Sequence, residues 1–450
     1  MALRRNLGLM EVVGLSLSMM APTSAMAFNV TLAAGAAGVA APLAFLLSTA
    51  ILLVVSLSFV SFSRRVASAG SAYAYITAEF GAGAGFIAGW ALLLTYVTFG
   101  AGISVLIGSF LDAALGNYHL GLPKFWVLHG TLAILLGMVL TARDMKLATR
   151  LMLVLEAASV LAIVVLGIVI LVAAAKTSGL PLAPFIPDKQ FGWSGVGYAL
   201  VFAILSFAGF ESGATLGEEA ANPRLAIAVA LIGTVLGAGV FFVFAAYTQV
   251  VGFGLAQVKD LANAAAPLNT LALRYGSRDF ATLLDIATAI SSFSCVLAAV
   301  SAAARMLFAL GRAGLAPSFG TVTAAGTPGR AILAVGGLML AGALLWAPQV
   351  GANGYYGAMG TIGVLSLILV YVGVTVAAAV YAIRRRDALW ACFGGAGAIA
   401  MLWPLYNSIY PVPAFPGNLW PYVVGIDLAV GAALLVLRPT LAQAPLVEAE

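Results

Sequence analysis

Charged side chains are scarce in this sequence, and their scarcity excludes most classes of soluble protein. Only 8% of the 450 residues are Asp, Glu, Lys or Arg, whereas 63% are hydrophobic. A chain with this balance has too few polar side chains to cover a water-facing globule. We therefore interpret the sequence as an integral membrane protein.

Residues that carry catalytic chemistry are also few. The chain has two cysteines and two histidines, and it contains no CxxC pair, no HExxH or GxSxG motif and no Walker A loop. Basic residues are scattered among short loops and form no single patch, so we expect no nucleic-acid partner. No loop is long enough for a separate signalling domain. The sequence therefore predicts neither an enzyme nor a receptor.

Most apolar runs are long enough to cross a bilayer, whose core of roughly 30 Å needs about 20 helical residues. We predict an all-α integral membrane fold with twelve transmembrane helices, the first of them uncleaved. The predicted spans cover residues 8–33, 39–62, 80–112, 124–142, 148–175, 193–220, 226–252, 281–314, 329–347, 353–383, 388–410 and 419–438.

Basic residues are distributed unequally between the two sides of these spans. If both ends of the chain are cytoplasmic, most of the 21 Lys and Arg residues lie on the inner side. The outer side keeps Lys124, Lys176, Lys189, Lys259, Arg274 and Arg278. The positive-inside rule thus predicts a multi-pass protein of the plasma membrane, the inner membrane of a bacterium, with cytoplasmic N- and C-termini.

Two of the predicted helices are interrupted near their middle. The first contains APTSA at Ala21–Ala25, where proline lacks an amide hydrogen, and the sixth contains FAGFESG at Phe207–Gly213, where glycines weaken the helix. Either break alone is explained by a kink or by close helix packing. Together, at the start of two similar-looking halves, they indicate a transporter site at the bilayer midplane.

The second break also carries a carboxylate, Glu211, in apolar sequence. An unpaired carboxylate in hydrocarbon costs roughly 2.5–3.5 kcal/mol even on the permissive insertion scale, so Glu211 is expected to face protein or water. One interpretation is a coupling or gating acid that accepts and releases a proton. The other is a permanently protonated clasp that hydrogen-bonds to backbone freed by the break.

Three other acidic residues have two interpretations each. Glu156, in the fifth span, either takes part in ion coupling or pairs locally with Arg150 or Arg305. Glu218 and Glu219 either form a solvated turn or join a salt bridge at an inner gate.

Several motifs together resemble the amino acid, polyamine and organocation (APC) superfamily, in its amino acid permease branch. The most specific is FAGFESGATLGEEAANPRLAI at Phe207–Ile227. SAGSAYAYI and GFIAGW near the third span, TARDMKLATRLMLVLE before the fifth and SAAARMLFALGRAGLAP after the eighth add to it. The resemblance covers nearly the whole chain.

The resemblance implies a five-plus-five inverted repeat with two additional helices. The chain would then form one transporter domain, residues 1–438. Its parts would be a first repeat over 1–175, a second repeat over 193–383, two helices over 388–438 and a short cytoplasmic tail over 439–450.

The resemblance also implies which residues meet the substrate. A substrate carboxylate would bind the amides of the first break, and an ammonium would bind carbonyls of both breaks. The substrate-binding residues are then Met19, Met20, Ala21, Thr23, Ser24, Ala25, Phe207, Ala208 and Phe210. A Na⁺ ion would be bound by Ser291, Ser292 and the Met20 carbonyl.

The sequence departs from the family pattern at three places. Ala21–Thr23 replaces a glycine-rich loop, which removes one amide donor. Ser159 stands where proton-coupled relatives often carry a lysine. Leu205 replaces an aromatic gate, so that another aromatic side chain has to close over the substrate. The candidates for this gate are Phe202, Phe207 and Phe210.

We predict a secondary transporter that imports a small amino acid by alternating access, coupled to Na⁺ or H⁺. The absence of a lysine at the Ser159 position favours Na⁺ as the coupling ion. Apart from a bound Na⁺ ion, we expect no cofactor. The alternatives are a permease for an amine, such as ethanolamine or a polyamine, and a substrate exchanger. We expect the protein to work in the lipid bilayer as a monomer or a homodimer.

Overall fold

The computed structural model describes residues 9–63, 71–118, 125–143, 147–177, 179–212, 223–323 and 326–442. Over these ranges the secondary structure is helical, with no strand. The all-α prediction is confirmed. Glu218 and Glu219, which were assigned to a turn or a gate, lie outside the described residues, and so does the side chain of Arg150.

Long helices dominate the described chain. The α-helices are α1 (Leu9–Met20), α2 (Pro22–Ala37), α3 (Ala41–Ser63), α4 (Ser71–Phe80), α5 (Ala82–Gly116), α6 (Trp126–Ala142), α7 (Leu147–Thr177), α8 (Gly192–Ser206), α9 (Pro223–Phe253), α10 (Val258–Asn263), α11 (Pro267–Tyr275), α12 (Arg278–Arg312), α13 (Gly329–Leu345), α14 (Ala347–Arg384), α15 (Ala388–Asn407) and α16 (Trp420–Leu437). Short 3₁₀ helices lie between some of them, at Gly38–Ala40, Ala183–Phe185, Leu255–Gln257 and Gly417–Leu419, and another, Pro439–Ala442, follows α16.

Nine helical stretches in the described residues are long and apolar enough to cross a membrane. One of them, Pro22–Ser63, joins α2 and α3, which the sequence analysis assigned to separate spans. Two shorter apolar helices are Trp126–Ala142 and Gly329–Leu345. The protein is therefore a multi-pass membrane protein.

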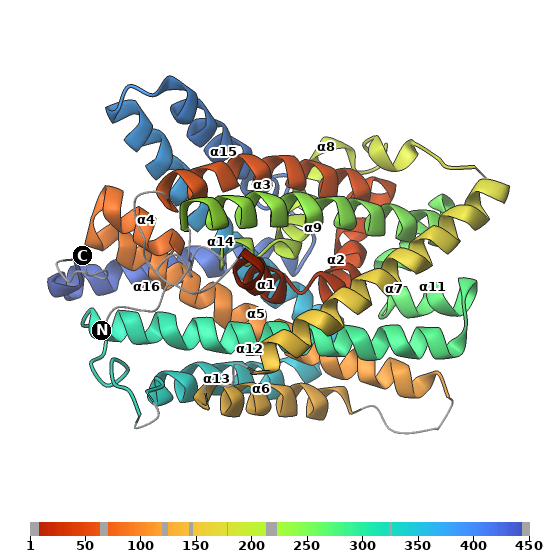
Figure 1. Cartoon of the computed structure of the whole chain (residues 1–450), viewed down its shortest axis with the longest axis horizontal. Coiled ribbons are helices and arrows are strands. Elements are labelled where there is room, and N and C mark those ends of the chain that lie inside the picture. The colour runs from red at the N-terminus through yellow and green to blue at the C-terminus, as the bar shows by residue number, and fades with distance from the viewer. Residues whose placement is uncertain are drawn as a thin grey trace.

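The helices pack in two groups with α1 between them (Figure 1). In one group α3 contacts α9, and in the other α12 contacts α6 and α13. Helix α5 is central, because it packs against both α12 and α14. Helix α7 lies at the edge and exposes Val154, Leu161 and Ile168, as expected for a helix that faces lipid.

The first predicted break is a single left-handed residue. Ala21 has φ 44° and ψ 65°, and it separates α1 from α2. Pro22 then occupies the first position of α2, where its missing N–H costs nothing because that group has no partner inside a helix. Thr23, Ser24 and Ala25 already belong to the first turn of α2.

The second predicted break follows α8 directly. Helix α8 ends at Ser206, and the chain continues in turns and a short 3₁₀ segment to Ser212. Gly209 has φ 97°, a conformation that costs other residues strain. The remainder of the predicted sixth span, residues 213–220, lies outside the described residues.

Candidate functional site

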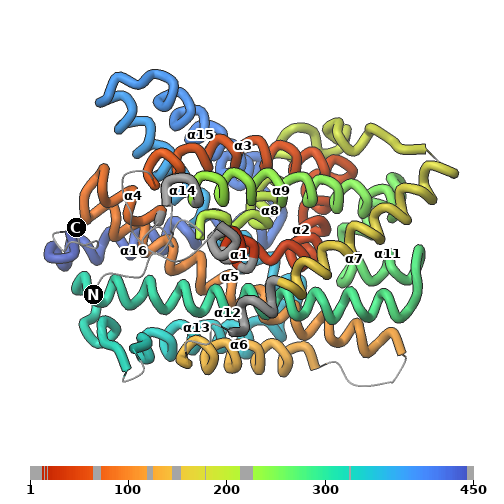
Figure 2. The backbone as a smooth tube through the Cα atoms, viewed as in Figure 1, coloured from red at the N-terminus to blue at the C-terminus, as the bar shows by residue number. Residues whose placement is uncertain are grey.

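The two broken helices touch each other at their breaks. A Cβ atom placed on Gly209 would lie 2.2 Å from Cγ of Met19, which only a glycine permits. The hydroxyl of Ser16 in α1 donates a hydrogen bond of 2.7 Å to the carbonyl of Phe210. Helix α2 also runs along α8 (Figure 2). Tertiary packing therefore brings together two segments that are far apart in the sequence.

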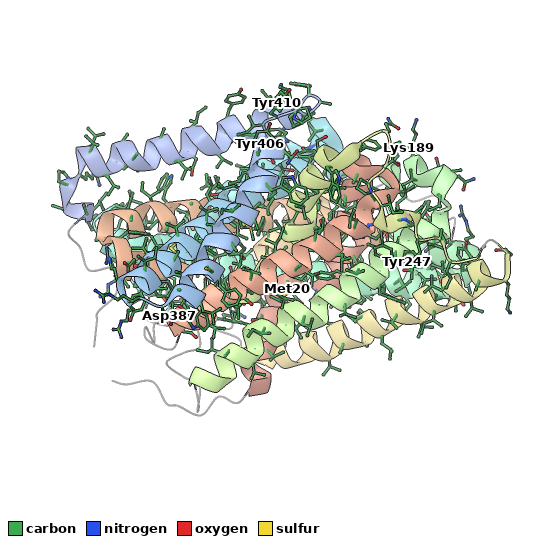
Figure 3. The ribbon with its side chains drawn as sticks, turned by 90° about the horizontal axis from the view of Figure 1, so that it is seen from above. Met20, Lys189, Tyr247, Asp387, Tyr406 and Tyr410 are labelled. Carbon is green, nitrogen blue, oxygen red and sulfur yellow. The ribbon has the colours of Figure 1, made fainter. Side chains whose placement is uncertain are left out.

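A pocket lies at this crossing. Met20 is about midway along the bundle, with Asp387 and Lys189 toward its opposite ends (Figure 3). The pocket is lined by Met19, Met20, Ala25, Asn29, Phe99, Gly102, Ile103, Leu205, Ala208, Cys295, Tyr356 and Gly360. Most of these residues are apolar, and they come from both breaks and from α5, α12 and α14. The arrangement suits a small ligand with an apolar part.

Five residues singled out from the sequence line this pocket, namely Met19, Met20, Ala25, Leu205 and Ala208. The three phenylalanines considered as gates are buried in other contacts. Phe207 packs edge-on against Phe242 at 4.8 Å, Phe210 contacts Phe59 and Tyr371, and Phe202 contacts Tyr198.

Asn29 is the principal polar residue of the pocket that the sequence analysis missed. Its amide group donates to the hydroxyl of Ser206 at 2.8 Å, and its carbonyl oxygen accepts from the hydroxyl of Tyr356 at 2.7 Å. These bonds tie α2 to α8 and α14. A strongly polar amide two turns after a helix break, in otherwise apolar sequence, is the signal that points to it.

The amides at the start of α2 all have partners in the protein. The Thr23 N–H donates to Oε1 of Glu156 at 2.7 Å, and the Ser24 N–H donates to the hydroxyl of Ser291 at 3.2 Å. The Ala25 N–H donates to the Ala21 carbonyl at 2.9 Å. The N-terminus of α2 attracts anions, and a carboxylate of the protein itself occupies it.

Oxygen atoms gather beside this contact. The hydroxyls of Ser24 and Ser292 are 2.7 Å apart, and Ser291 lies next to the Glu156 carboxylate. Oxygen donors of this kind suit a hard cation such as Na⁺. Ser159, three residues after Glu156 in α7, is also buried, but its hydroxyl donates to the Leu155 carbonyl of its own helix.

Glu211 occupies a separate position in an aromatic surrounding. It is 4% exposed, and its Oε2 accepts a hydrogen bond of 2.7 Å from the hydroxyl of Tyr371 in α14. Phe59 packs against Phe210 at 5.6 Å and against Tyr371 at 5.8 Å. Tyr96 of α5 lies close enough to Glu211 to be affected by its charge. The carboxyl group therefore links the second break to α14.

Comparison with known proteins supports the transport interpretation of this geometry. Residues 7–430 match the amino acid permease family. The chain is 32% identical over 307 residues to the branched-chain amino acid permease BcaP of Lactococcus lactis, covering 63% of each chain. It is 25% identical over 329 residues to the methylthioribose transporter of Bacillus subtilis, covering 70% of this chain and 69% of the relative.

A further relative is the low-affinity putrescine importer PlaP of Escherichia coli, with 28% identity over 355 residues, 75% of this chain and 74% of the relative. The aligned part thus spans a little under two thirds of the Lactococcus relative and somewhat more of the other two. The family match covers both helix breaks and the pocket between them. The chain therefore belongs to the amino acid permease family and is a membrane transporter of the APC type, not an enzyme.

Proposed function

We propose that this protein imports a small amino acid by alternating access, with uptake driven by Na⁺ or H⁺. The observation that carries the proposal is the pocket at the crossing of the two breaks. Paired interrupted helices are typical of transporter sites at the bilayer midplane. A pocket lined from several helices opens to one side or the other when one group of helices moves against the rest.

The proposal includes an architecture of twelve spans with cytoplasmic termini in the plasma membrane. Residues 1–175 and 193–383 would form two inverted repeats of five helices, followed by two helices in 388–438 and a tail over 439–450. The α1/α2 break near the start of one half and the break after α8 near the start of the other support this division.

The substrate is proposed to lie with its apolar side chain among Phe99, Ile103 and Leu205. Its ammonium would bind backbone carbonyls of the breaks, near Met19 and Met20 in the first and near Phe207, Ala208 and Phe210 in the second. Carbonyl groups released from helical hydrogen bonding are the usual partners of cations at such breaks. The apolar lining and the relative that is a branched-chain amino acid permease both favour an aliphatic side chain.

Two parts of the site are candidates for coupling. Ser291, Ser292 and the Met20 carbonyl would bind Na⁺, and the hydroxyls beside Glu156 support this assignment. Glu211 would act as the gating acid, because its hydrogen bond to Tyr371 joins two elements that move relative to each other in alternating access. A proton on Glu211 would add an O–H donor to a carboxyl group that otherwise only accepts, so protonation would change the hydrogen bonding between the two elements.

An amine substrate is the second candidate function. The observation that favours it is the occupation of the α2 amides by Glu156, Ser291 and the Ala21 carbonyl, which leaves a substrate carboxylate no vacant amide there. The putrescine importer among the relatives is consistent with this alternative.

Uptake into proteoliposomes tests the proposal. Labelled leucine, alanine, ethanolamine and putrescine would be offered under an inward Na⁺ gradient, under an inward proton gradient and under neither. We expect an aliphatic amino acid to accumulate only when one of the gradients is present. Accumulation of amines alone would favour the second candidate, and no uptake of any of these compounds would contradict both.

A further inference from the structure

We propose that Gly360 of α14 determines which substrate side chains fit the pocket, because it leaves the space into which the Leu205 side chain packs. This inference rests on the proposed function and deepens it. It names a residue that sets the upper size limit of the transported side chain. Gly360 acts through Leu205 and is therefore a positioning residue for the substrate.

The contact between Gly360 and Leu205 joins α14 to α8 at the wall of the pocket. Both residues line the pocket, and Leu205 is 9% exposed. A Cβ atom placed on Gly360 would lie 2.8 Å from Cδ2 of Leu205. Carbon atoms in contact are normally separated by roughly 3.5–4.0 Å, so an alanine at position 360 would overlap the Leu205 methyl group.

A second pocket residue packs against the same helix in the same way. Phe99 of α5 lines the pocket, and a Cβ atom on Gly363 would lie 2.5 Å from Cε1 of its ring. The hydroxyl of Thr95 donates to the Gly363 carbonyl at 3.1 Å and so holds α5 close to α14. Residues three apart lie on one face of a helix. Two apolar walls of the pocket therefore depend on glycines on one face of α14.

A methyl group at position 360 would displace the Leu205 side chain rather than a helix. Among the described residues, Cδ2 of Leu205 is the one atom from another helix within 4 Å of that position. This atom is the far end of a flexible side chain, which moves more easily than packed backbone does. Because Leu205 borders the pocket, the free space into which its methyl group moves is the pocket itself. The displaced group would then occupy space that a substrate side chain needs.

The size limit follows from the volume of these side chains. With Leu205 packed against Gly360, the pocket has room for a branched aliphatic side chain, and the wild-type protein should prefer leucine to the larger phenylalanine. With Leu205 displaced, only a small side chain such as that of alanine fits. One methylene group in an apolar pocket changes discrimination by roughly 10–200-fold. A single methyl group at position 360 is therefore enough to change the preferred substrate.

Uptake by the full-length protein in proteoliposomes tests the inference, with inward Na⁺ and proton gradients both applied. Initial rates would be measured for labelled alanine, leucine and phenylalanine at limiting concentration. Gly360→Ala should lower the leucine-to-alanine ratio by about tenfold or more. Gly357→Ala, on the same helix, is the matched control and should keep the wild-type ratio. Its Cβ would lie 3.6 Å from Cδ2 of Leu32, an ordinary contact outside the pocket. A wild-type ratio in Gly360→Ala would overturn the inference.

The substitution Leu205→Ala provides a second test that adds no atoms to the protein. It should raise the phenylalanine-to-leucine ratio by about tenfold or more, because the pocket gains the volume of the lost side chain. The double variant Gly360→Ala/Leu205→Ala should recover leucine uptake, since the added methyl group then overlaps nothing. A double variant as selective against leucine as Gly360→Ala alone would show that the glycine acts elsewhere. If Gly360→Ala does not fold, the ratio in Leu205→Ala decides, and an unchanged ratio overturns the inference.

Failure of the proposed function gives a different result. Ethylamine and 3-methylbutylamine carry the side chains of alanine and leucine on an ammonium group without a carboxylate. If the wild-type protein takes up these amines and no amino acid, import of an amino acid is wrong, and the same change of ratio between the two amines tests Gly360. If transport is normal and no substitution changes a ratio, the inference alone fails. If the wild-type protein takes up none of these compounds, both fail.

Discussion

Gly209 and Met19 are in contact where the two broken helices cross. A Cβ atom on Gly209 would lie 2.2 Å from Cγ and 2.8 Å from Cβ of Met19. The φ of Gly209 is 97°, so an L-residue there would also adopt a strained backbone. The close approach and the unusual backbone together explain a glycine at the second break.

Substitution Gly209→Ala should destabilise the protein. The backbone strain costs about 1–2 kcal/mol and the overlap with Met19 adds roughly 1–3 kcal/mol. Thermal unfolding in detergent should therefore occur several degrees lower, and substrate binding should weaken because the crossing lines the pocket. Gly237→Ala is the matched control, since a Cβ on Gly237 in α9 meets nothing within 4 Å. Equal melting temperatures for the two variants would contradict this account.

Substitution Tyr371→Phe isolates the hydrogen bond to Glu211. It keeps the aromatic ring between Phe59 and Phe210 but removes the donor 2.7 Å from the buried carboxyl oxygen. The loss should cost about 1–3 kcal/mol of stability and should change the transport rate more than substrate affinity if the bond belongs to a gate. Uptake rates and equilibrium binding, measured on the same preparation, separate these effects.

The control for this experiment is Tyr422→Phe, because Tyr422 is exposed on α16. This substitution should leave the uptake rate and the equilibrium binding of substrate unchanged. A Tyr371→Phe protein with normal uptake and normal stability would argue against any role for the Glu211 contact.

Asn29 and Tyr356 should show energetic coupling. Their hydrogen bond of 2.7 Å is buried at the pocket, and Asn29 also binds Ser206. A double-mutant cycle with Asn29→Ala and Tyr356→Phe should give an interaction energy of about 0.5–3 kcal/mol in thermal or denaturant unfolding. Additive effects of the two substitutions would show that the bond contributes nothing beyond the packing of each side chain.

Na⁺ should stabilise the protein if the hydroxyl cluster binds it. A ligand present at 100 times its Kd adds about 2.7 kcal/mol to the folded state, which raises the melting temperature. Ser292→Ala should abolish this shift, because it removes the hydroxyl 2.7 Å from Ser24. Ser294→Ala on the same helix is the matched control, since that hydroxyl bonds to the Ile290 carbonyl of its own helix.

Choline chloride at the same ionic strength corrects for general salt effects. A stabilisation that is equal in Na⁺ and choline, or that persists in Ser292→Ala, would show that Na⁺ does not bind at this cluster. That result would favour a proton as the coupling ion.

Several features followed from local sequence alone. Membrane spanning depends on the length and apolarity of consecutive residues, so the all-α membrane fold was predictable without any contact information. The break at Pro22 was predictable because proline cannot continue the hydrogen bonding of a helix, and the break near Gly209 because glycine weakens one. The motif at Phe207–Ile227 indicated the family, which the match over residues 7–430 confirms.

The roles of individual site residues stay predictions, although packing places several of them around one pocket. Sequence reasoning named both Glu156 and Ser159 on the fifth span but did not place either against a particular helix. In the structure Glu156 accepts a hydrogen bond from the Thr23 N–H of α2, whereas the Ser159 hydroxyl bonds to its own helix. Which residues of α7 face α2 depends on the rotation of α7 about its own axis. Because α7 is apolar on all sides, its sequence pattern does not indicate this rotation.

The sequence by itself determined that the chain is helical and lies in a membrane, where two of its helices break, and to which family it belongs, because each of these depends on composition or on short motifs. Tertiary structure alone decided which groups meet. Glu156 reaches Thr23 across 133 residues, Asn29 is held between Ser206 and Tyr356, and Tyr371 bonds to Glu211. The reason is physical: hydrogen bonds in the interior depend on distances of about 3 Å between helices, and no pattern along one helix encodes its distance to another.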